Sequence, residues 1–190
     1  MSLKNSYNRL QYNISRTMEL DPAAKSRLEM LLLYPHIKAL NYHRVANWFW
    51  RNNHHFMARF VSNRGRHKTG IEIHPGATIG WGLVIDHGMG VVIGETAIIE
   101  DDCQLYHGVT LGGRGTMDVK RHPTLLKGAY VGSGAKVLGN ITLGRYSKVG
   151  ANAVVLEDVP DGATAVGLPA QIVKKRPLED LCGNTDVKAG

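Results

Sequence analysis

From residue 71 onward, aliphatic residues recur at every sixth position, and this spacing limits the possible folds more than any other feature of the chain. Thirteen positions lie on this six-residue grid: Ile73, Ile79, Ile85, Ile93, Ile99, Leu105, Leu111, Leu125, Val131, Val137, Leu143, Val149 and Val155. A period of six matches neither an α-helix nor a simple array of hairpins. It is typical of a parallel β-helix in which three short strands and three tight corners make one triangular coil. The grid therefore predicts about four to five coils.

A second column of small residues supports the same fold. Four positions after most grid residues stands a small or short aliphatic side chain: Ala77, Ala97, Cys103, Val109, Ala129, Ala135, Ser147 and Ala153. We expect both columns to point inward and to fill the core of the coils. Cys103 is accordingly interpreted as a small buried hydrophobic residue.

The residues before the repeat have helical spacing instead. Asp21 followed by Pro22 predicts a helix N-cap with proline at the first helical position, and breaks are expected at Pro35 and near Asn52. The predicted organisation is a flexible N-terminal segment (residues 1–19), a helical region (20–68), a β-helix domain (69–173) and a C-terminal tail (174–190).

Charge and composition narrow the classes of partner. The net charge of +7 and the isoelectric point of about 9.5 favour an anionic ligand. Basic residues are dispersed and no nucleic-acid motif is present, so a phosphate-bearing small molecule is expected rather than nucleic acid. Cys103 and Cys182 are too few for a disulfide framework, which fits a cytoplasmic location. No signal segment or membrane-length apolar run is found, so no membrane association is expected.

The six-residue grid is interrupted twice. Ile85 and Ile93 are eight residues apart, and this first break holds Asp86 and His87. The second gap, of fourteen residues, carries the polar side chains Arg114, Lys120, Arg121 and His122. Insertions in a solenoid form outward loops, which often carry function. We expect function at both breaks, with neutral drift as the alternative; from the repeat alone, His87 is either a catalytic group or a hydrogen-bonded corner histidine.

Several segments resemble the serine acetyltransferases, which catalyse the first step of cysteine synthesis from serine. They are DPAAKSRLEMLLLYPHIKALNYHR, TGIEIHPGATIGWGLVIDHGMGVVIGETA, LYHGVTLGG, KRHPTL and VGSGAKVLGNITLG, within residues 20 to about 173. The resemblance implies a helical region followed by a left-handed parallel β-helix. It also implies transfer of an acetyl group from acetyl-CoA to the serine hydroxyl, at sites between the subunits of a homotrimer.

The resemblance assigns roles to the acid–base pair. A serine hydroxyl needs a base to accept its proton, and His87 is the candidate, since the pKa of histidine suits this task. The family has an acid just before the sequence IHP, and Glu72 matches that position. Glu72 is therefore expected to orient His87 and to stabilise its charged form; the alternative is a solvated charge on the outer wall.

Other positions are expected to hold the two substrates. Asp86 is predicted to pair with the serine ammonium group, and Arg121 with its carboxylate, assisted by His122. The resemblance adds Asp21 as a further serine contact. For acetyl-CoA, a co-substrate rather than a tightly bound cofactor, the expected contacts are backbone amides near small residues and basic side chains near the phosphates: Gly113, Ser133, Ala151, Lys148 and Arg145.

The same residues disfavour two alternative functions and leave one rival. A zinc carbonic anhydrase needs clustered histidine ligands, but His87, His107 and His122 are scattered, so no metal is expected. A non-catalytic scaffold is equally disfavoured. The stronger rival is an acetyltransferase acting on a sugar or on another hydroxy amino acid. The resemblance also implies two further assemblies, a dimer of trimers and a complex with O-acetylserine sulfhydrylase, the enzyme that makes cysteine and binds a C-terminal isoleucine of many family members. Both stay open, because the helical region is short and the chain ends in DVKAG rather than isoleucine.

Overall fold

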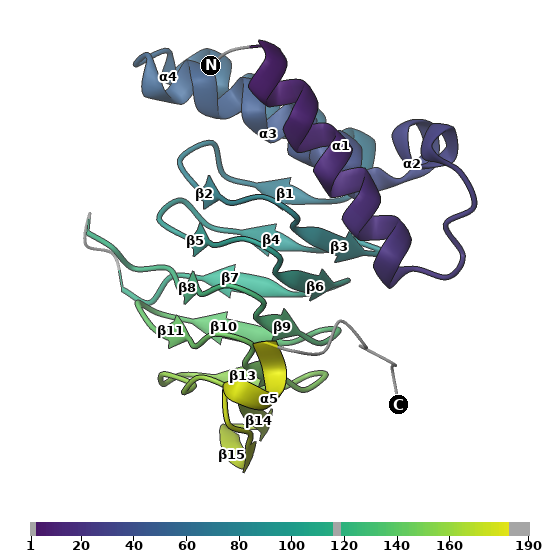
Figure 1. Ribbon diagram of the computed structural model, residues 1–190. Coiled ribbons are helices and arrows are strands. Elements are labelled where there is room, and N and C mark those ends of the chain that lie inside the picture. The colour runs from purple at the N-terminus through teal and green to yellow at the C-terminus, as the bar shows by residue number, and fades with distance from the viewer. Residues whose placement is uncertain (1–2, 116–118, 183–190) are drawn as a thin grey trace.

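A computed structural model describes residues 3–115 and 119–182. Four helices come first, and Figure 1 shows them together at one end of a stack of short strands. They are α1 (Leu3–Leu20), α2 (Arg27–Leu33), α3 (Pro35–Arg51) and α4 (His55–Thr69). Pro35 begins α3, and the chain breaks again at Asn52, as the sequence predicts.

The strands form the three faces of a parallel β-helix of about five turns. The first face holds β1 (Glu72–Ile73), β4 (Val92–Ile93), β7 (Thr110–Gly112), β10 (Lys136–Leu138) and β13 (Val154–Val155). The second holds β2 (Thr78–Ile79), β5 (Ile98–Ile99), β8 (Thr124–Leu125) and β11 (Thr142–Leu143). The third holds β3 (Val84–Asp86), β6 (Gln104–Tyr106), β9 (Tyr130–Val131), β12 (Lys148–Val149), β14 (Ala163–Gly167) and β15 (Ala170–Lys175).

The core of the β-helix consists of the two columns that the sequence predicts. Grid residues stack directly on one another, so that Ile73 pairs with Ile93 and Ile93 with Leu111. Every grid residue and every member of the small-residue column is buried. Cys103 is fully buried among them, and burial raises the pKa of its thiol to about 12. Its interpretation as a small hydrophobic residue is confirmed.

The first 19 residues differ from the expectation of a flexible segment, because α1 extends from Leu3 to Leu20. Contacts with the coils hold this helix. Gly82 N–H donates to Asn13 Oδ1 at 2.9 Å, and the Tyr12 hydroxyl donates to Asp102 Oδ1 at 2.7 Å. The predicted N-cap is also wrong: Asp21 follows the end of α1, and Ser26 caps α2 by accepting a hydrogen bond from Glu29 N–H.

The C-terminal part adds an antiparallel pair to the third face. β14 and β15 pair antiparallel, so the last strand extends into the predicted tail, and α5 (Glu179–Cys182) follows. The terminal DVKAG lies outside the described residues. In the described ranges no helix has both the length and the apolar character needed to cross a membrane.

Candidate active site

One edge of the β-helix aligns several predicted site residues. Asp86 pairs with Tyr106, and the strands below continue this register, so the residues that follow occupy equivalent places in successive coils. These residues are His107, Ser133 and Ala151, one for each of three successive coils. In the first coil Met89 takes the equivalent place, since Gly108 N–H donates to Met89 O. His87 belongs to the two extra residues just before it, and its ring lies beside that of His107. We call this line the His87 edge; it lies where the third face leads into the first.

The first break in the repeat changes the backbone at this edge. His87 has a φ of 58°, and Gly88 N–H closes a three-residue turn by donating to Asp86 O at 2.7 Å. Such a conformation is strained for a residue with a side chain, and strain of this kind clusters at functional sites. The turn leaves the His87 side chain 74% exposed, with its ring 5.7 Å from that of His107. The two extra residues thus present an accessible imidazole on a rigid wall.

Two acidic residues from distant parts of the sequence act electrostatically on the same tyrosines near this edge. Asp86 ends β3, while Asp21 lies in the turn between α1 and α2. The pKa of Tyr34 is raised to about 12 by burial, by its hydrogen bond to Asp21 and by the charges of both aspartates. Burial, Tyr130 and the same two aspartates raise the pKa of Tyr106 to about 12. Asp21 and Asp86 thus both lie within electrostatic range of the same two tyrosines, which gives this corner negative charge.

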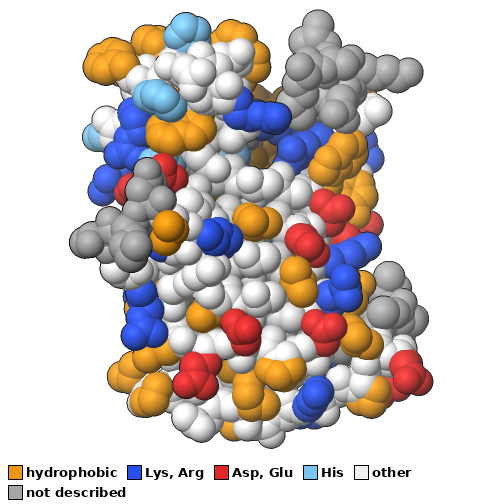
Figure 2. All heavy atoms as spheres, turned by 90° about the vertical axis from the view of Figure 1, so that its left-hand side faces the viewer, with side chains coloured by type: hydrophobic (Ala, Val, Ile, Leu, Met, Phe, Trp, Pro, Cys, Tyr) orange, Lys and Arg blue, Asp and Glu red, His pale blue; other side chains and the backbone are white. Residues whose placement is uncertain are grey.

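Glu72 lies on β1 and faces α4. Its carboxylate forms an ion pair with Arg66 at 3.0 Å, and in the described part of the chain it makes no hydrogen bond with His87. Glu72, Arg66 and His74 help to line a hollow of about 320 Å³ between α4 and the first coil. Basic side chains and histidines gather at this helical end of the molecule, whereas acidic and basic side chains are interspersed over the lower coils (Figure 2). The role of Glu72 as partner of the base stays a prediction.

A second edge holds the other serine-binding candidates, where the first face leads into the second. Arg121 Nη2 forms a 2.7 Å ion pair with Glu95. Thr96 Oγ1 accepts hydrogen bonds from the backbone N–H groups of Arg121 and His122, at 3.0 and 3.1 Å. These contacts hold the end of the loop between β7 and β8 against the corner that follows β4. We call this group the Arg121 edge.

The His122 ring is buried at the Arg121 edge, with only 8% of the residue exposed. Its Nδ1 accepts from Thr96 N–H at 3.2 Å and lies 2.9 Å from Thr96 Oγ1, which places the ring proton on Nε2. A Cβ atom on Gly94 would overlap the ring, so glycine is required there. Burial, followed by the charge of Arg121, lowers the pKa of His122. His122 is therefore a neutral donor, suited to binding an anion.

The predicted acetyl-CoA contacts divide between the two edges. Ser133 and Ala151 lie on the His87 edge, whereas Gly113 lies at the Arg121 edge, close to the side chains of Arg121 and His122. Lys148 is exposed on the outer side of β12, and Arg145 is exposed at the corner before it. Below His107, the His87 edge thus carries two small residues in successive coils, Ser133 and Ala151.

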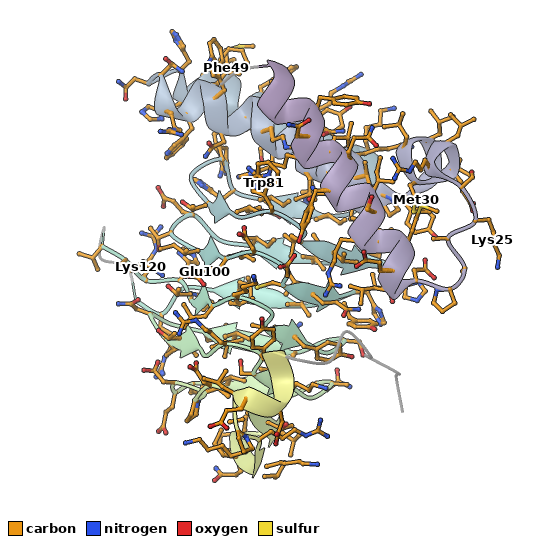
Figure 3. All side chains as sticks on the ribbon, viewed as in Figure 1. Lys25, Met30, Phe49, Trp81, Glu100 and Lys120 are labelled. Atoms are coloured by element: carbon orange, nitrogen blue, oxygen red, sulfur yellow. The ribbon has the colours of Figure 1, made fainter. Side chains whose placement is uncertain are left out.

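The two edges lie apart within one protomer. In Figure 3 the labelled Lys120, on the loop after β7, is on the opposite side of the coils from Lys25 and Met30, which flank the Asp21 turn and α2. Figure 1 shows the ends of β3 and β6 on the α2 side. The Arg121 edge and His87 are thus on different sides of the β-helix.

Sequence reasoning did not select three residues that shape these sites: Tyr34, Glu95 and Thr96. Glu95 and Thr96 lie within the quoted segment TGIEIHPGATIGWGLVIDHGMGVVIGETA, so a signal was present. Tyr34 had a weaker signal, a polar aromatic residue directly before the helix-starting Pro35. No group of side chains in the described residues is arranged to hold a metal ion.

The β-helix and its histidine-bearing corner define the class of protein, an acyltransferase of the hexapeptide-repeat type with a left-handed β-helix. A serine acetyltransferase of Helicobacter pylori is 56% identical over 166 residues, which are 87% of this chain and 97% of that protein. The chain belongs to the serine acetyltransferase family. No family model matches the sequence.

Solved structures agree with this assignment. Soybean serine acetyltransferase complexed with serine superimposes with a TM-score of 0.85 at 42% identity, over 87% of this chain and 68% of that one. The Brucella abortus enzyme in complex with coenzyme A gives a TM-score of 0.89 at 36% identity, over 92% and 70% of the two chains. The predicted fold class is confirmed.

Proposed function

We propose that this protein transfers the acetyl group of acetyl-CoA to the hydroxyl of L-serine, with His87 as the general base. His87 accepts the hydroxyl proton while the serine oxygen attacks the thioester carbonyl carbon. The tetrahedral intermediate then expels CoA as its C–S bond breaks, and the imidazolium returns the proton to the leaving sulfur. The products are O-acetyl-L-serine and CoA. The observation that carries this assignment is the exposed imidazole in a strained turn, with its Nε2 3.9 Å from Asp86 Oδ1.

Serine is recognised as a zwitterion. Asp86 and Asp21 attract its ammonium group, while Arg121 and the neutral donor His122 bind its carboxylate. This pairing of opposite charges favours an amino acid over a sugar. Acetyl-CoA, which the family's solved complex supports as co-substrate, runs along Ser133 and Ala151, and Lys148 faces its phosphates.

A homotrimer follows from the separation of the two edges. The base and the carboxylate site lie on different sides of one protomer, so a complete site requires the His87 edge of one subunit against the Arg121 edge of the next. The protein is also proposed to act in the cytoplasm, since the described thiol, Cys103, is free and buried.

The test is the release of free CoA thiol from acetyl-CoA in the presence of four acceptors. L-Serine should support fast release. Ethanolamine lacks the carboxylate, 3-hydroxypropionate lacks the ammonium group and glucose lacks both, so each should be slower by at least about tenfold. Rates with glucose or ethanolamine equal to the rate with serine would show that serine is not the specific acceptor, and would favour the rival acetyltransferase.

A further inference from the structure

Tyr34 occupies an unusual place in the helical region. It ends α2 and directly precedes Pro35, the first residue of α3, with an extended backbone (φ −75°, ψ 118°). A residue before proline is driven out of the helical conformation. The helix break therefore turns this single side chain out of both helices and toward the turn that carries Asp21.

Both carboxylate oxygens of Asp21 are held. Oδ2 accepts a hydrogen bond from the Tyr34 hydroxyl at 2.6 Å, and Oδ1 accepts one from Ala23 N–H at 2.8 Å. The raised pKa of Tyr34 keeps its hydroxyl protonated and donating at neutral pH. A carboxylate with two fixed donors has one orientation, although Asp21 lies in a turn between helices.

Tyr34 is in turn held by the core of the helical region. It packs against a small cluster of buried residues, Ile14, Met30 and Ile37, and its ring lies 5.9 Å from that of His36. His36 is buried and lies 3.0 Å from Thr17 Oγ1 on α1. The orientation of Asp21 is thus coupled to packing between α1, α2 and α3.

We propose that Tyr34 is a positioning residue for serine binding, which holds the Asp21 carboxylate toward Asp86 so that both receive the ammonium group. This inference rests on the proposed role of Asp21 at the serine site. Tyr34 acts through Asp21 and need not touch the substrate. Its loss should weaken serine binding while the acetyl transfer step and acetyl-CoA binding are preserved.

The experiment compares two matched tyrosine variants. Tyr34→Phe removes the hydroxyl but keeps the ring in the apolar cluster, and Tyr12→Phe removes an equivalent hydrogen bond to Asp102 elsewhere. Tyr34→Phe should raise the KM for serine by about threefold to tenfold, the effect expected for one hydrogen bond. Its kcat and its KM for acetyl-CoA should stay within about twofold of wild type. Tyr12→Phe should leave the KM for serine unchanged.

A double-variant cycle tests whether Tyr34 acts through Asp21. Asp21→Ala should raise the KM for serine more than Tyr34→Phe does, and adding Tyr34→Phe to Asp21→Ala should change it no further. An unchanged KM in Tyr34→Phe, multiplicative effects in the double variant, or an unchanged KM in Asp21→Ala would each overturn the proposal. Melting temperatures of all variants show whether they fold. Failure of the wild-type enzyme to acetylate serine would instead refute the proposed function itself.

Discussion

At the residue scale, the site depends on side chains that are fixed before any substrate arrives. Thr96 Oγ1 accepts hydrogen bonds from two backbone N–H groups at the end of the loop between β7 and β8. Glu95 holds the Arg121 guanidinium through an ion pair. Donors that are already oriented lose little entropy on binding a carboxylate. The groups proposed to bind the serine carboxylate therefore belong to a corner that is already held by hydrogen bonds and an ion pair.

Replacement of Arg121 should mainly impair the use of serine. A lost charge-assisted contact is worth roughly 1.5–3 kcal/mol, so Arg121→Ala should lower serine kcat/KM by about one to two orders of magnitude. Steady-state kinetics at saturating acetyl-CoA measure this effect. Lys127→Ala, which removes an ion pair with Asp102 at 3.7 Å, is the control and should behave as wild type. Collapse of acetyl-CoA affinity with normal serine handling would move Arg121 to the nucleotide site.

At the element scale, the strand positions could be predicted from the sequence because they follow its six-residue period. Features that depend on contacts between distant residues could not. The grid and the small-residue column determine strand positions, because each coil buries the same two columns. The helix α1 escaped prediction because polar contacts with the coils, such as Asn13 to Gly82, stabilise it. The ion pair between Arg121 and Glu95 could not be predicted either, because the conformation of the loop between β7 and β8 determines which side chains come into contact.

Ser147 is the one polar member of the small-residue column. Its Oγ is buried and has no hydrogen-bond partner among the described residues, whereas most equivalent positions carry alanine. An unsatisfied buried hydroxyl costs about 1–3 kcal/mol. Ser147→Ala should therefore raise the melting temperature by a few degrees without changing activity. A lower melting temperature than wild type would mean that the hydroxyl has a partner. Ala129→Ser, in the coil before, is the reverse control and should destabilise.

Two buried histidines should make the helical region sensitive to acid. Burial lowers the pKa of His36 and of His43 to about 4. Below about pH 6.5 the two histidines are protonated in the unfolded chain but stay neutral in the folded one. Their burial therefore costs no stability above that pH, and the free energy of unfolding falls as the pH decreases toward 4. From pH 7 to pH 5 the loss should be roughly 1–2 kcal/mol for each histidine. Chemical denaturation at several pH values measures it.

The contribution of one histidine can be isolated. His43 Nε2 lies 3.1 Å from Ala77 O, and His43→Gln can keep a donor there without a titrating group. This variant should lose less stability between pH 7 and pH 5 than wild type. His67→Gln, which replaces an exposed histidine on α4, should keep the wild-type slope. Equal slopes in all three proteins would show that His43 is not buried as a neutral ring.

At the scale of the whole molecule, the proposed site needs residues from two neighbouring subunits. Subunits carrying His87→Ala and subunits carrying Arg121→Ala, co-expressed with different tags and purified through both, should form mixed trimers. Each mixed trimer pairs one intact His87 edge with one intact Arg121 edge, so about one-third of wild-type activity should return. Mixed assemblies as inactive as their parents would show that each site is built within a single protomer.

The central claim is that His87 removes the proton from the serine hydroxyl. The most direct measurement is the pH dependence of CoA release with serine, for wild type and for His87→Ala. General-base catalysis contributes about 10²–10⁴-fold, so the variant should lose that much kcat while its affinity for acetyl-CoA is retained. The rise of wild-type kcat/KM with pH should vanish in the variant, because the group that accepts the proton is gone. An alanine variant that keeps more than about a tenth of wild-type kcat, with the same rise, would contradict the account.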